Sequence, residues 1–245
     1  MKVVLISQAR MTSTRLPGKV LKTVLGKPLL EYQIERLKRV SLADEIVIAT
    51  TTNDTDAPVV ELCDRLGIKC YRGPEEDVLA RFHGAAHAHE ADAVIRITAD
   101  CPIVDPLVVD KVVQFFRDYQ ETCDYASNSL VRSYPRGMDT EVFSVRALDE
   151  AFFEAVAKND REHVTPFIYN HPERYRLTSL VSPEDRSSHR WTVDTQEDFD
   201  LIKLIIESLY PSKPEFTLDD VVALLRTHPA WTLINSHIEQ KKLGE

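Results

Sequence analysis

Three cationic and three hydroxyl side chains gather within twelve residues near the start of the chain. This segment, Gln8–Lys19, directly follows an apolar run, Val3–Ile6, that predicts a buried strand. Its cations and hydroxyls, with no acid among them, are Arg10, Arg15, Lys19, Thr12, Ser13 and Thr14. Guanidinium groups bind phosphate oxygens through paired hydrogen bonds, and lysine adds a point charge. Position and composition favour a triphosphate-binding loop over an ordinary solvated basic loop.

Two aspartates follow predicted strands elsewhere in the chain. Asp100 stands in Thr98–Pro102, where a strand ends at a proline turn, and Asp194 stands in Arg190–Thr195, where another expected strand meets a helix. Thr195 can cap that helix, so Asp194 is not needed for capping. Ligands bind at the carboxyl ends of strands in open α/β sheets, so the two carboxylates could share one magnesium ion with substrate phosphates. The alternative is that each accepts local hydrogen bonds only.

The segment Pro135–Glu141 adds two further carboxylates. Asp139 and Glu141 lie two residues apart, and on a strand they would share one face. Such a pair either binds sugar hydroxyls or marks a solvated edge strand. Together with Arg161 they are the candidates for acceptor recognition. His163 is the strongest candidate among the eight histidines, although a helix-surface or dimer role is favoured for it.

The elements that must position these groups alternate regularly in the first half of the chain. Short apolar, β-branched runs predict strands at Val3–Ile6, Glu45–Ala49, Ile68–Tyr71 and Ala93–Thr98. Apolar residues at helical spacing predict helices at Pro28–Val40, Asp56–Leu66, Asp77–Glu90 and Pro106–Tyr119, the last capped by Asp105. This alternation predicts an α/β fold, with a mainly parallel central sheet and helices on both faces.

The second half of the chain is less regular. It predicts strands at Thr140–Phe143, Arg176–Val181 and Arg190–Val193. It also predicts helices at Val145–Ala157, Arg161–Asn170, Gln196–Tyr210 and Val221–Arg226, the last two opened by the capping boxes Thr195–Asp198 and Thr217–Asp220. We expect one domain over residues 1–245, with residues 211–245 forming a C-terminal helix and tail.

The charge distribution limits the kinds of partner. Thirty basic and 39 acidic residues give a net charge of −9, which argues against a nucleic-acid or membrane-surface binder. Residues 1–30 nonetheless contain six basic side chains and no acid. A cationic segment on an anionic body favours a small anionic ligand.

Glycine and cysteine usage excludes other classes of protein. None of the seven glycines belongs to a GxGxxG or GxxxxGK[ST] pattern, so a glycine-lined phosphate loop is not expected. The four cysteines show neither a CxxC nor a zinc spacing, which favours reduced thiols in a cytoplasmic protein. No stretch approaches the ~20 apolar residues of a membrane helix, and the first apolar run is too short for a signal peptide.

These motifs together resemble the cytidylyltransferases that make CMP-activated acidic sugars, among them the synthetases for CMP-3-deoxy-manno-octulosonate and CMP-acylneuraminate. The resemblance is greatest to the branch of spore coat polysaccharide biosynthesis protein F, and it covers residues 1–208 or thereabouts. Ala9–Lys19 is similar to the family's nucleotide loop, A-R-x-x-S-x-R-L-P-x-K. Thr98–Pro106 and Val193–Asp198 look like its two metal motifs. Two further stretches look typical of the branch, Arg136–Phe143 and Arg161–Pro166.

The resemblance implies a nucleotide-diphospho-sugar transferase fold of the glycosyltransferase-A kind, CTP as donor, Mg²⁺ as cofactor, an acidic sugar or similar small molecule as acceptor, and a homodimer. It implies that Asp100 and Asp194 hold the metal. The residues implied to bind CTP are Ala9, Arg10, Ser13, Arg15 and Lys19. The chain departs from the octulosonate synthetases at Cys101, where they have Glu, and at Gly73–Arg81, where they have Ser-Gly-Thr-Asp-Arg. Within this second stretch, the candidates for the nucleotide region are Asp77 and Arg81.

The expected reaction is attack of an acceptor oxygen on the α-phosphorus of CTP, with release of pyrophosphate. The residues expected to carry it are Arg10, Arg15 and Lys19, which offset phosphate charge, and Asp100 and Asp194, which hold the metal. Three alternatives stay open: a glycosyltransferase of the same fold, a sugar-1-phosphate or phosphonate nucleotidylyltransferase, and a catalytically silent nucleotide-binding partner.

Overall fold

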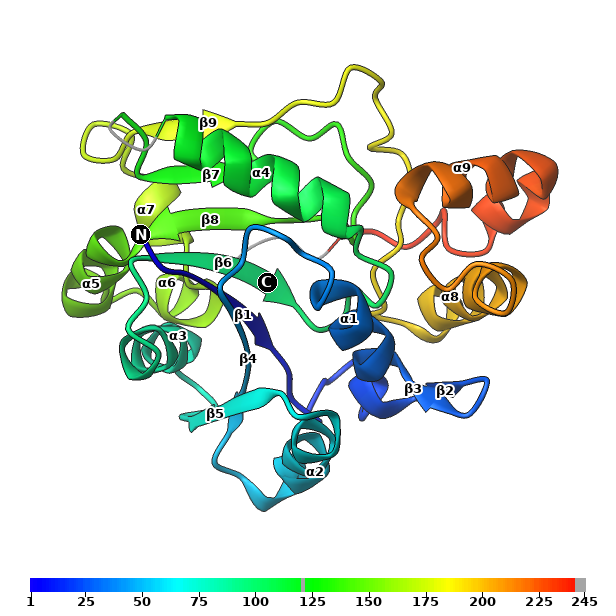
Figure 1. Ribbon diagram of the computed structural model, residues 1–245, viewed down its shortest axis with the longest axis horizontal. Helices are drawn as coiled ribbons and strands as arrows, with labels where there is room; N and C mark the ends of the chain where they lie inside the picture. The colour runs from blue at the N-terminus through cyan, green and yellow to red at the C-terminus, as the bar shows by residue number, and fades with distance from the viewer. Residues whose placement is uncertain (120–121, 241–245) are drawn as a thin grey trace.

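A seven-stranded sheet forms the centre of the computed structural model, which describes residues 1–119 and 122–240 (Figure 1). The strands lie in the order β5-β4-β1-β6-β8-β7-β9. Their bounds are β1 Val3–Gln8, β4 Glu45–Thr51, β5 Lys69–Gly73, β6 Ala93–Thr98, β7 Tyr125–Ser127, β8 Glu141–Ser144 and β9 Leu177–Ser179. Neighbouring strands are parallel except where β8 pairs with β6 and with β7. The sheet is therefore mainly parallel.

Helices cover both faces of this sheet. They are α1 Leu29–Leu37, α2 Ala57–Leu66 and α4 Pro106–Asp118 on one face, and α3 Val78–Ala88 and α5 Val145–Glu154 on the other. Alternate residues of β1 reach opposite faces, as a strand requires. Val4 and Ile6 pack with α3 and α5, whereas Val3 and Leu5 pack with α1 and α4. The predicted α/β class, with a parallel sheet between helices, is confirmed.

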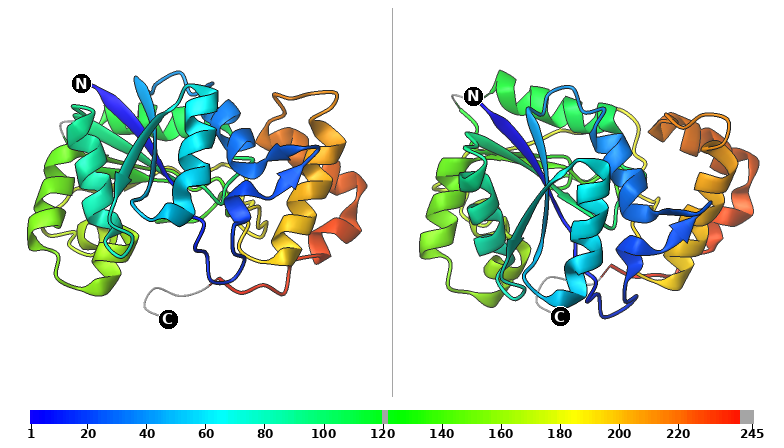
Figure 2. Two further views of the ribbon diagram at one scale, coloured as in Figure 1. Left: turned by 90° about the horizontal axis from the view of Figure 1, so that it is seen from below. Right: turned by 60° about the horizontal axis from the view of Figure 1, so that its bottom comes forward.

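A second apolar cluster lies beside these layers (Figure 2). It is built from α8 Gln196–Leu209, α9 Leu218–Thr227 and the hairpin of β2 Thr23–Val24 with β3 Lys27–Pro28. Both predicted capping boxes are confirmed at the starts of α8 and α9. Short 3-10 turns complete the described structure at η1 Lys19–Leu21, η2 Asp54–Asp56 and η3 Pro229–Leu233.

The strand predicted at Arg190–Val193 is wrong. Only Arg190 forms a bridge, with Arg136, and the three residues after it lie outside the sheet. Trp191 and Val193 are fully buried because they pack into the cluster around α8 and α9. The apolar residues of this segment therefore indicated that it is buried, but not that it pairs with a strand of the sheet.

The helix predicted at Arg161–Asn170 is also wrong as a single element. The structure has two short helices, α6 Lys158–His163 and α7 Pro166–Tyr169. Val164 between them has φ +74°, which a helix cannot contain, and Pro166 starts the second helix because it needs no N–H bond there. The short strands β2, β3 and β7 were not predicted. The strand predicted at Ala93–Thr98 has the observed bounds, and the other predicted elements are present with shifted ends.

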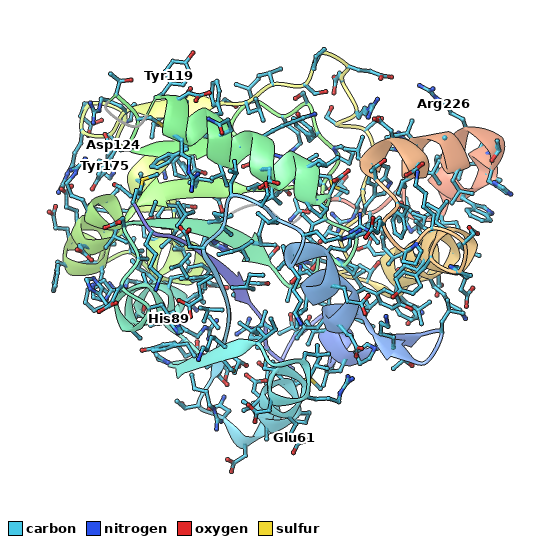
Figure 3. The ribbon with its side chains drawn as sticks, in the orientation of Figure 1. Glu61, His89, Tyr119, Asp124, Tyr175 and Arg226 are labelled. Carbon is cyan, nitrogen blue, oxygen red and sulfur yellow. The ribbon has the colours of Figure 1, made fainter. Side chains whose placement is uncertain are left out.

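Asp124 fastens the outer strands to α5 (Figure 3). Its carboxylate accepts hydrogen bonds from the backbone N–H of Arg176 at 2.9 Å and from the guanidinium of Arg146 at 2.5 Å. Burial alone would raise the pKa of Asp124, but these bonds lower it. This anchor holds the ends of β7 and β9 in place beside α5.

Three further sequence expectations concern the chain as a whole. The cysteines Cys63, Cys70, Cys101 and Cys123 are free thiols. Across residues 1–119 and 122–240, the helices are too short or too polar to cross a lipid bilayer. The end of the expected tail, residues 241–245, lies outside the described residues. The organisation as one domain stays a prediction.

The order of the strands creates a switch point beside β1. The chain passes from β1 to β4 and β5 on one side and then returns to β6 on the other. Gln8 and Thr98 pair at the ends of β1 and β6, so the segments that follow them leave the sheet at the same place. Crevices of this kind are where open α/β sheets bind ligands.

Candidate functional site

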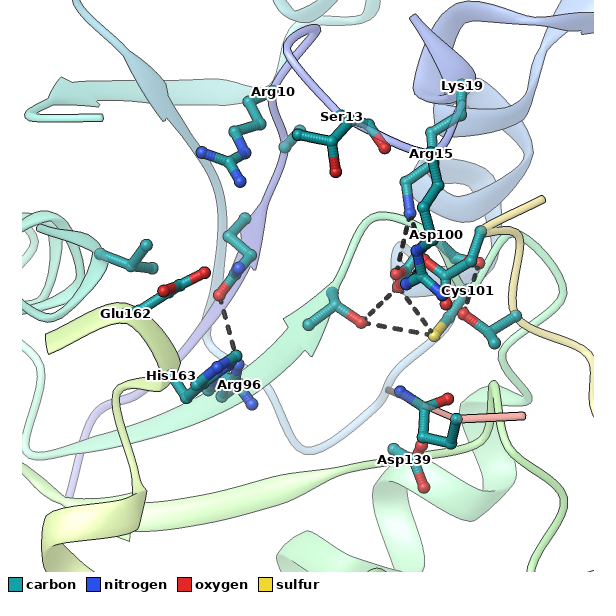
Figure 4. Close-up of a pocket in the computed structure, with 18 of the residues that line it drawn as sticks. Arg10, Ser13, Arg15, Lys19, Arg96, Asp100, Cys101, Asp139, Glu162 and His163 are labelled. Atoms are coloured by element: carbon teal, nitrogen blue, oxygen red, sulfur yellow. Dashed lines mark hydrogen bonds and ion pairs between the residues drawn. The ribbon is translucent and has the colours of Figure 1, made fainter. Parts of the chain in front are cut away.

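A cavity of about 910 Å³ opens at this switch point (Figure 4). The loop after β1, the end of β6, the start of α3, α6 and the segments around Arg136 and Thr192 form its walls. Most of the predicted site residues line it, namely Ala9, Arg10, Ser13, Arg15, Lys19, Arg81, Asp100, Asp139 and Asp194. The structure thus brings together motifs that lie up to 185 positions apart in the sequence.

The loop after β1 is held in a closed shape by backbone contacts. The N–H of Met11 donates to Asp56 Oδ1 at 2.7 Å, and the N–H of Gly18 donates to the carbonyl of Met11 at 2.9 Å. Gly18 has φ +67°, a conformation that favours glycine. Closure at Gly18 starts η1 at Lys19 and directs the loop's cations toward the cavity.

Lys19 joins the two predicted metal-binding aspartates. Its Nζ lies 2.8 Å from Asp194 Oδ1 and 3.1 Å from Asp100 Oδ2, and its side chain is only 12% exposed. Burial alone lowers the pKa of Lys19, but the two carboxylates outweigh it and the pKa is raised. Burial likewise raises the pKa of Asp100, while Lys19 and the Thr98 hydroxyl, 2.5 Å from Asp100 Oδ1, hold that pKa at about 2. Lys19 and Asp100 are therefore charged at neutral pH.

Asp194 is surrounded by cations. Arg15 Nη2 lies 2.9 Å from Oδ1, and Arg190 Nη2 lies 2.9 Å from Oδ2. Arg190 also donates to Asp198, whose carboxylate accepts from the side-chain amide of Asn235 at 2.8 Å. The sequence reasoning missed Arg190 as a positioning residue. A charged side chain next to the buried Trp191 was the available signal.

The two aspartate motifs are also joined through their backbones. The N–H of Val193 donates to the carbonyl of Asp100 at 2.8 Å, and the hydroxyl of Thr192 lies 3.3 Å from the same oxygen. The relative position of the two carboxylates is thus fixed by direct contacts, and it does not depend on Lys19 alone.

Arg10 and Arg81 lie at another side of the cavity. Arg10 Nη1 is 3.5 Å from Glu75 Oε1, and the buried Arg81 donates to the carbonyl of Pro74 at 3.0 Å. Burial, with the nearby charge of Arg10, lowers the pKa of Arg81 to about 10. Glu75 also accepts from the hydroxyl of Thr12 and so ties down the loop after β1. Sequence reasoning did not single out this role of Glu75.

Two of the predicted residues pair with each other behind the cavity wall. Asp77 caps α3 by accepting from the N–H of Ala80 at 2.9 Å, and its other oxygen accepts from Arg161. Arg161 also donates to the carbonyl of Phe152 at 2.6 Å. Asp77 and Arg161 do not belong to the residues that line the cavity. They hold the start of α3, which carries Arg81.

Glu141 also has a structural position. Its strand, β8, lies between β6 and β7, so the interpretation as a solvated edge strand is wrong. The buried carboxylate pairs with Arg96, and one of its oxygens accepts from the hydroxyls of Tyr125 and Thr165, each at 2.6 Å. Arg96 lines the cavity, whereas Glu141 does not. Glu141 therefore positions Arg96.

Asp139 does face the cavity, where it pairs with Arg132 at 2.6 Å. It follows Gly137, which has φ +99° and lies against the backbone of Trp191. A Cβ at Gly137 would lie 2.6 Å from the Trp191 carbonyl, so only glycine allows this approach. The approach places Asp139 beside the segment that carries Asp194.

The wall across from Lys19 and Asp100 comes from α6 (Figure 4). Lys158, Glu162 and His163 line the cavity there. His163 thus lies at the cavity, whereas the sequence favoured a helix-surface or dimer role for it. Its chemical role stays a prediction.

A cavity at the switch point of a mainly parallel sheet, with a cationic loop and two carboxylates, defines an α/β nucleotidyltransferase fold. The family model described as "Cytidylyltransferase" matches residues 4–226. The chain therefore belongs to the cytidylyltransferase family, and it is an enzyme of the nucleotidyltransferase class. This finding confirms the predicted family and the predicted enzyme class, and it disfavours the glycosyltransferase alternative.

Individual relatives agree with this assignment. The chain is 36% identical to uncharacterized protein MJ1063 of Methanocaldococcus jannaschii, over 100% of this chain and 99% of that protein. It is 34% identical to spore coat polysaccharide biosynthesis protein SpsF of Bacillus subtilis, over 93% of this chain and 95% of SpsF.

Solved structures are similar as well. A cytidylyltransferase from Leptospira borgpetersenii superposes with a TM-score of 0.91 at 29% identity, over 99% of this chain and 100% of that one. A CMP:2-keto-3-deoxy-manno-octonic acid synthetase complexed with CTP superposes with a TM-score of 0.64 at 20% identity, over 85% of this chain and 100% of that one. This second likeness shows the shared fold.

Proposed function

We propose that this protein is a magnesium-dependent cytidylyltransferase that transfers CMP from CTP to an acidic sugar or a related small acid, in surface or spore-coat polysaccharide biosynthesis. The observation that carries the proposal is the contact of Lys19 with both Asp100 and Asp194 inside a cavity that Arg10 and Arg15 also line. The names of SpsF and of the CTP-bound synthetase support the pathway and the nucleotide.

The two carboxylates have the chemistry of a magnesium site. Asp100 and Asp194 present oxygen atoms that a single cationic group, Lys19 Nζ, contacts at the same time. Carboxylate oxygens are the ligands Mg²⁺ prefers, and two carboxylates with substrate phosphates form a usual magnesium site. When bound there, Mg²⁺ supplies positive charge next to the reacting phosphate oxygens.

The side chains of the loop after β1 bind the triphosphate. Arg10, Arg15 and Lys19 provide cationic donors, and Ser13 provides a hydroxyl. Charge on the leaving pyrophosphate grows as the bond breaks, so donors already in place stabilise the transition state more than the ground state. The buried Arg81 adds a further cation to the same cavity.

The reaction exchanges one phosphorus–oxygen bond for another. A hydroxyl oxygen of the acceptor attacks the α-phosphorus of CTP, and the bond from this phosphorus to the bridging oxygen of the β-phosphate breaks. Pyrophosphate leaves, the acceptor carries CMP, and the hydroxyl proton passes to water. Lys19 and Arg15 hold the donor during this displacement.

The acceptor occupies the side of the cavity away from the loop after β1. Arg96, Arg136 and Lys158 line that part, and their positive charge supports an acidic acceptor. Asp139 and Glu162 line it too and can accept hydrogen bonds from sugar hydroxyls. Glu141 and Arg161 contribute from behind the wall, through Arg96 and through Asp77.

Pyrophosphate release is the direct test. The protein is incubated with CTP, Mg²⁺ and a panel of acidic sugars, sugar 1-phosphates and phosphonates, and pyrophosphate is measured. We expect release with an acidic sugar and a rise of the melting temperature with CTP. If pyrophosphate is released only with a sugar 1-phosphate or a phosphonate, that compound class is the acceptor and the acidic sugar is not. If no pyrophosphate is released and CTP does not change the melting temperature, the proposal is refuted. The homodimer and the cytoplasmic location stay predictions.

A further inference from the structure

Two histidines and an aspartate meet on the outer side of α3 and α5, which lie next to each other (Figure 1). His83 and His87 are one turn apart on α3, so both rings project from the same side of the helix. Asp149 faces them from α5. These three residues do not line the cavity described above, so the cluster is separate from the nucleotide site.

The three side chains converge on one point. Oδ1 of Asp149 lies 3.2 Å from Nε2 of His83 and 2.6 Å from Nε2 of His87. One oxygen thus contacts both imidazole rings, and the ligand atoms of all three residues lie within 4.8 Å of one another. A tetrahedral ion with bonds of about 2.0 Å keeps its ligand atoms about 3.3 Å apart. Small rotations of the three side chains are enough to bring their ligand atoms to that spacing.

The surroundings hold the His83 ring in this position. The ring stacks on Phe152 with centroids 3.9 Å apart and planes at 12°, and Phe153 meets it edge-on. Imidazole nitrogens carry the lone pairs that bind a metal ion. The more exposed His87 and Asp149 leave room for water to complete the coordination.

We propose that His83, His87 and Asp149 form a second metal site, which takes a divalent ion that prefers imidazole, with zinc as the representative ion. Two imidazole nitrogens and one carboxylate oxygen, with an open position, are typical of zinc. Mg²⁺ prefers oxygen ligands and is the expected ion of the Asp100 and Asp194 site instead. The proposal does not depend on the proposed function, because none of its residues belongs to the nucleotide site.

A metal ion at this place would link α3 to α5. The start of α3 carries Arg81 in the cavity wall and is already fastened by Asp77 and Arg161. A bond between the two helices would add to that clamp. Ions that bind only the folded state stabilise it, so the expected consequence of binding is a higher melting temperature.

Zinc binding to the full-length, untagged protein tests the proposal. Isothermal titration with Zn²⁺ is performed in excess Mg²⁺, which occupies the carboxylate site. We expect one zinc ion per chain and a zinc-dependent rise in melting temperature. His87→Gln and Asp149→Asn should each weaken zinc binding at least tenfold, because each removes a ligand. Cobalt(II) should give a visible absorption band in the wild type that the two variants lack.

His89→Gln is the matched control. His89 follows α3 and contacts Glu45, outside the cluster (Figure 3). The His89→Gln variant should bind zinc with the affinity of the wild type. The exposed His87 is chosen because its replacement leaves the stacked His83 in place, and a melting curve without metal checks the folding of each variant. Zinc affinity that is the same in wild type, His87→Gln and Asp149→Asn would overturn the proposal, as would no zinc binding by the wild type.

Discussion

The ammonium group of Lys19 lies 2.8 Å from the carboxylate of Asp194, although 175 positions separate the two residues. The contact joins the cationic loop after β1 to a carboxylate that Arg190 holds from the other side. At this contact, a cation proposed to bind phosphate, Lys19, lies against a carboxylate proposed to bind the metal, Asp194. The proposed chemistry depends on this geometry.

Lys19→Met should weaken catalysis with CTP. The substitution removes a buried cation that contacts both Asp100 and Asp194, and it leaves their charges less compensated. We expect kcat/KM for CTP to fall by about 10²-fold, a usual effect of losing one preorganised charged donor. Steady-state kinetics of pyrophosphate release measures it. Lys22→Met is the control, because Lys22 lies near the same loop but contacts Gln196 and Phe199, and it should keep near-normal kinetics.

The stability of the fold should fall at acid pH in a way that depends on Asp100. The pKa of this carboxyl is about 2 in the folded protein, below its usual value of 3.8. A lowered pKa means that the stabilisation is complete above about pH 4 and is lost as the pH falls toward 2. The contribution is about 2 kcal/mol. Urea unfolding at pH 5, 4 and 3 should show a smaller loss for Asp100→Asn than for the wild type, and equal losses would contradict the assignment.

Gly137→Ala should destabilise the protein strongly. The residue has φ +99°, and a Cβ would lie 2.6 Å from the backbone carbonyl of Trp191. We expect a loss of about 3 kcal/mol in the free energy of unfolding, from strain and from displacement of a buried segment. Gly26→Ala isolates the backbone term, because Gly26 has φ +75° and open space around it. Its cost should be about 1 kcal/mol. Chemical denaturation measures both, and similar losses would show that the close approach is unimportant.

Glu141→Gln should reduce stability more than it affects acceptor specificity. The substitution removes the buried carboxylate that pairs with Arg96, a side chain that is only 13% exposed, and this costs about 3 kcal/mol. Glu162→Gln changes a residue on the cavity wall, so it should raise the KM for the acceptor and leave the melting temperature nearly unchanged. Melting curves and acceptor kinetics of the two variants separate the roles. If Glu141→Gln has a normal melting temperature and a raised KM for the acceptor, the structural role is contradicted and Glu141 contacts the acceptor.

The sequence was sufficient to predict the first half of the fold, because regular alternation of β-branched and amphipathic segments leaves few alternatives. Asp100 was predicted for the switch point from its place at the end of β6, and it lies there. Asp194 also lies at the cavity, yet the strand expected before it does not exist. The burial of Trp191, which looks like strand pairing in sequence, comes from packing against α8 and α9.

Tertiary partners explain what sequence patterns could not provide. Glu141 and Arg161 were predicted as acceptor residues from their charge. In the fold, Glu141 forms an ion pair with Arg96, and Arg161 forms one with Asp77. The contacts of Glu75 with the loop after β1 join positions about 60 residues apart, and no local sequence pattern predicts such contacts. Charge and position after a strand therefore identified where the site would form, while contacts between distant segments decided which side chains face the cavity.

The most direct test of the central claim is transfer of the α-phosphate label from [α-³²P]CTP to an acidic sugar in the presence of Mg²⁺. We predict that the label appears in a CMP-sugar product in equal amount to the pyrophosphate released, and that Asp100→Asn reduces this transfer at least 10²-fold. Failure to label any acidic acceptor, or undiminished transfer by Asp100→Asn, would contradict the account.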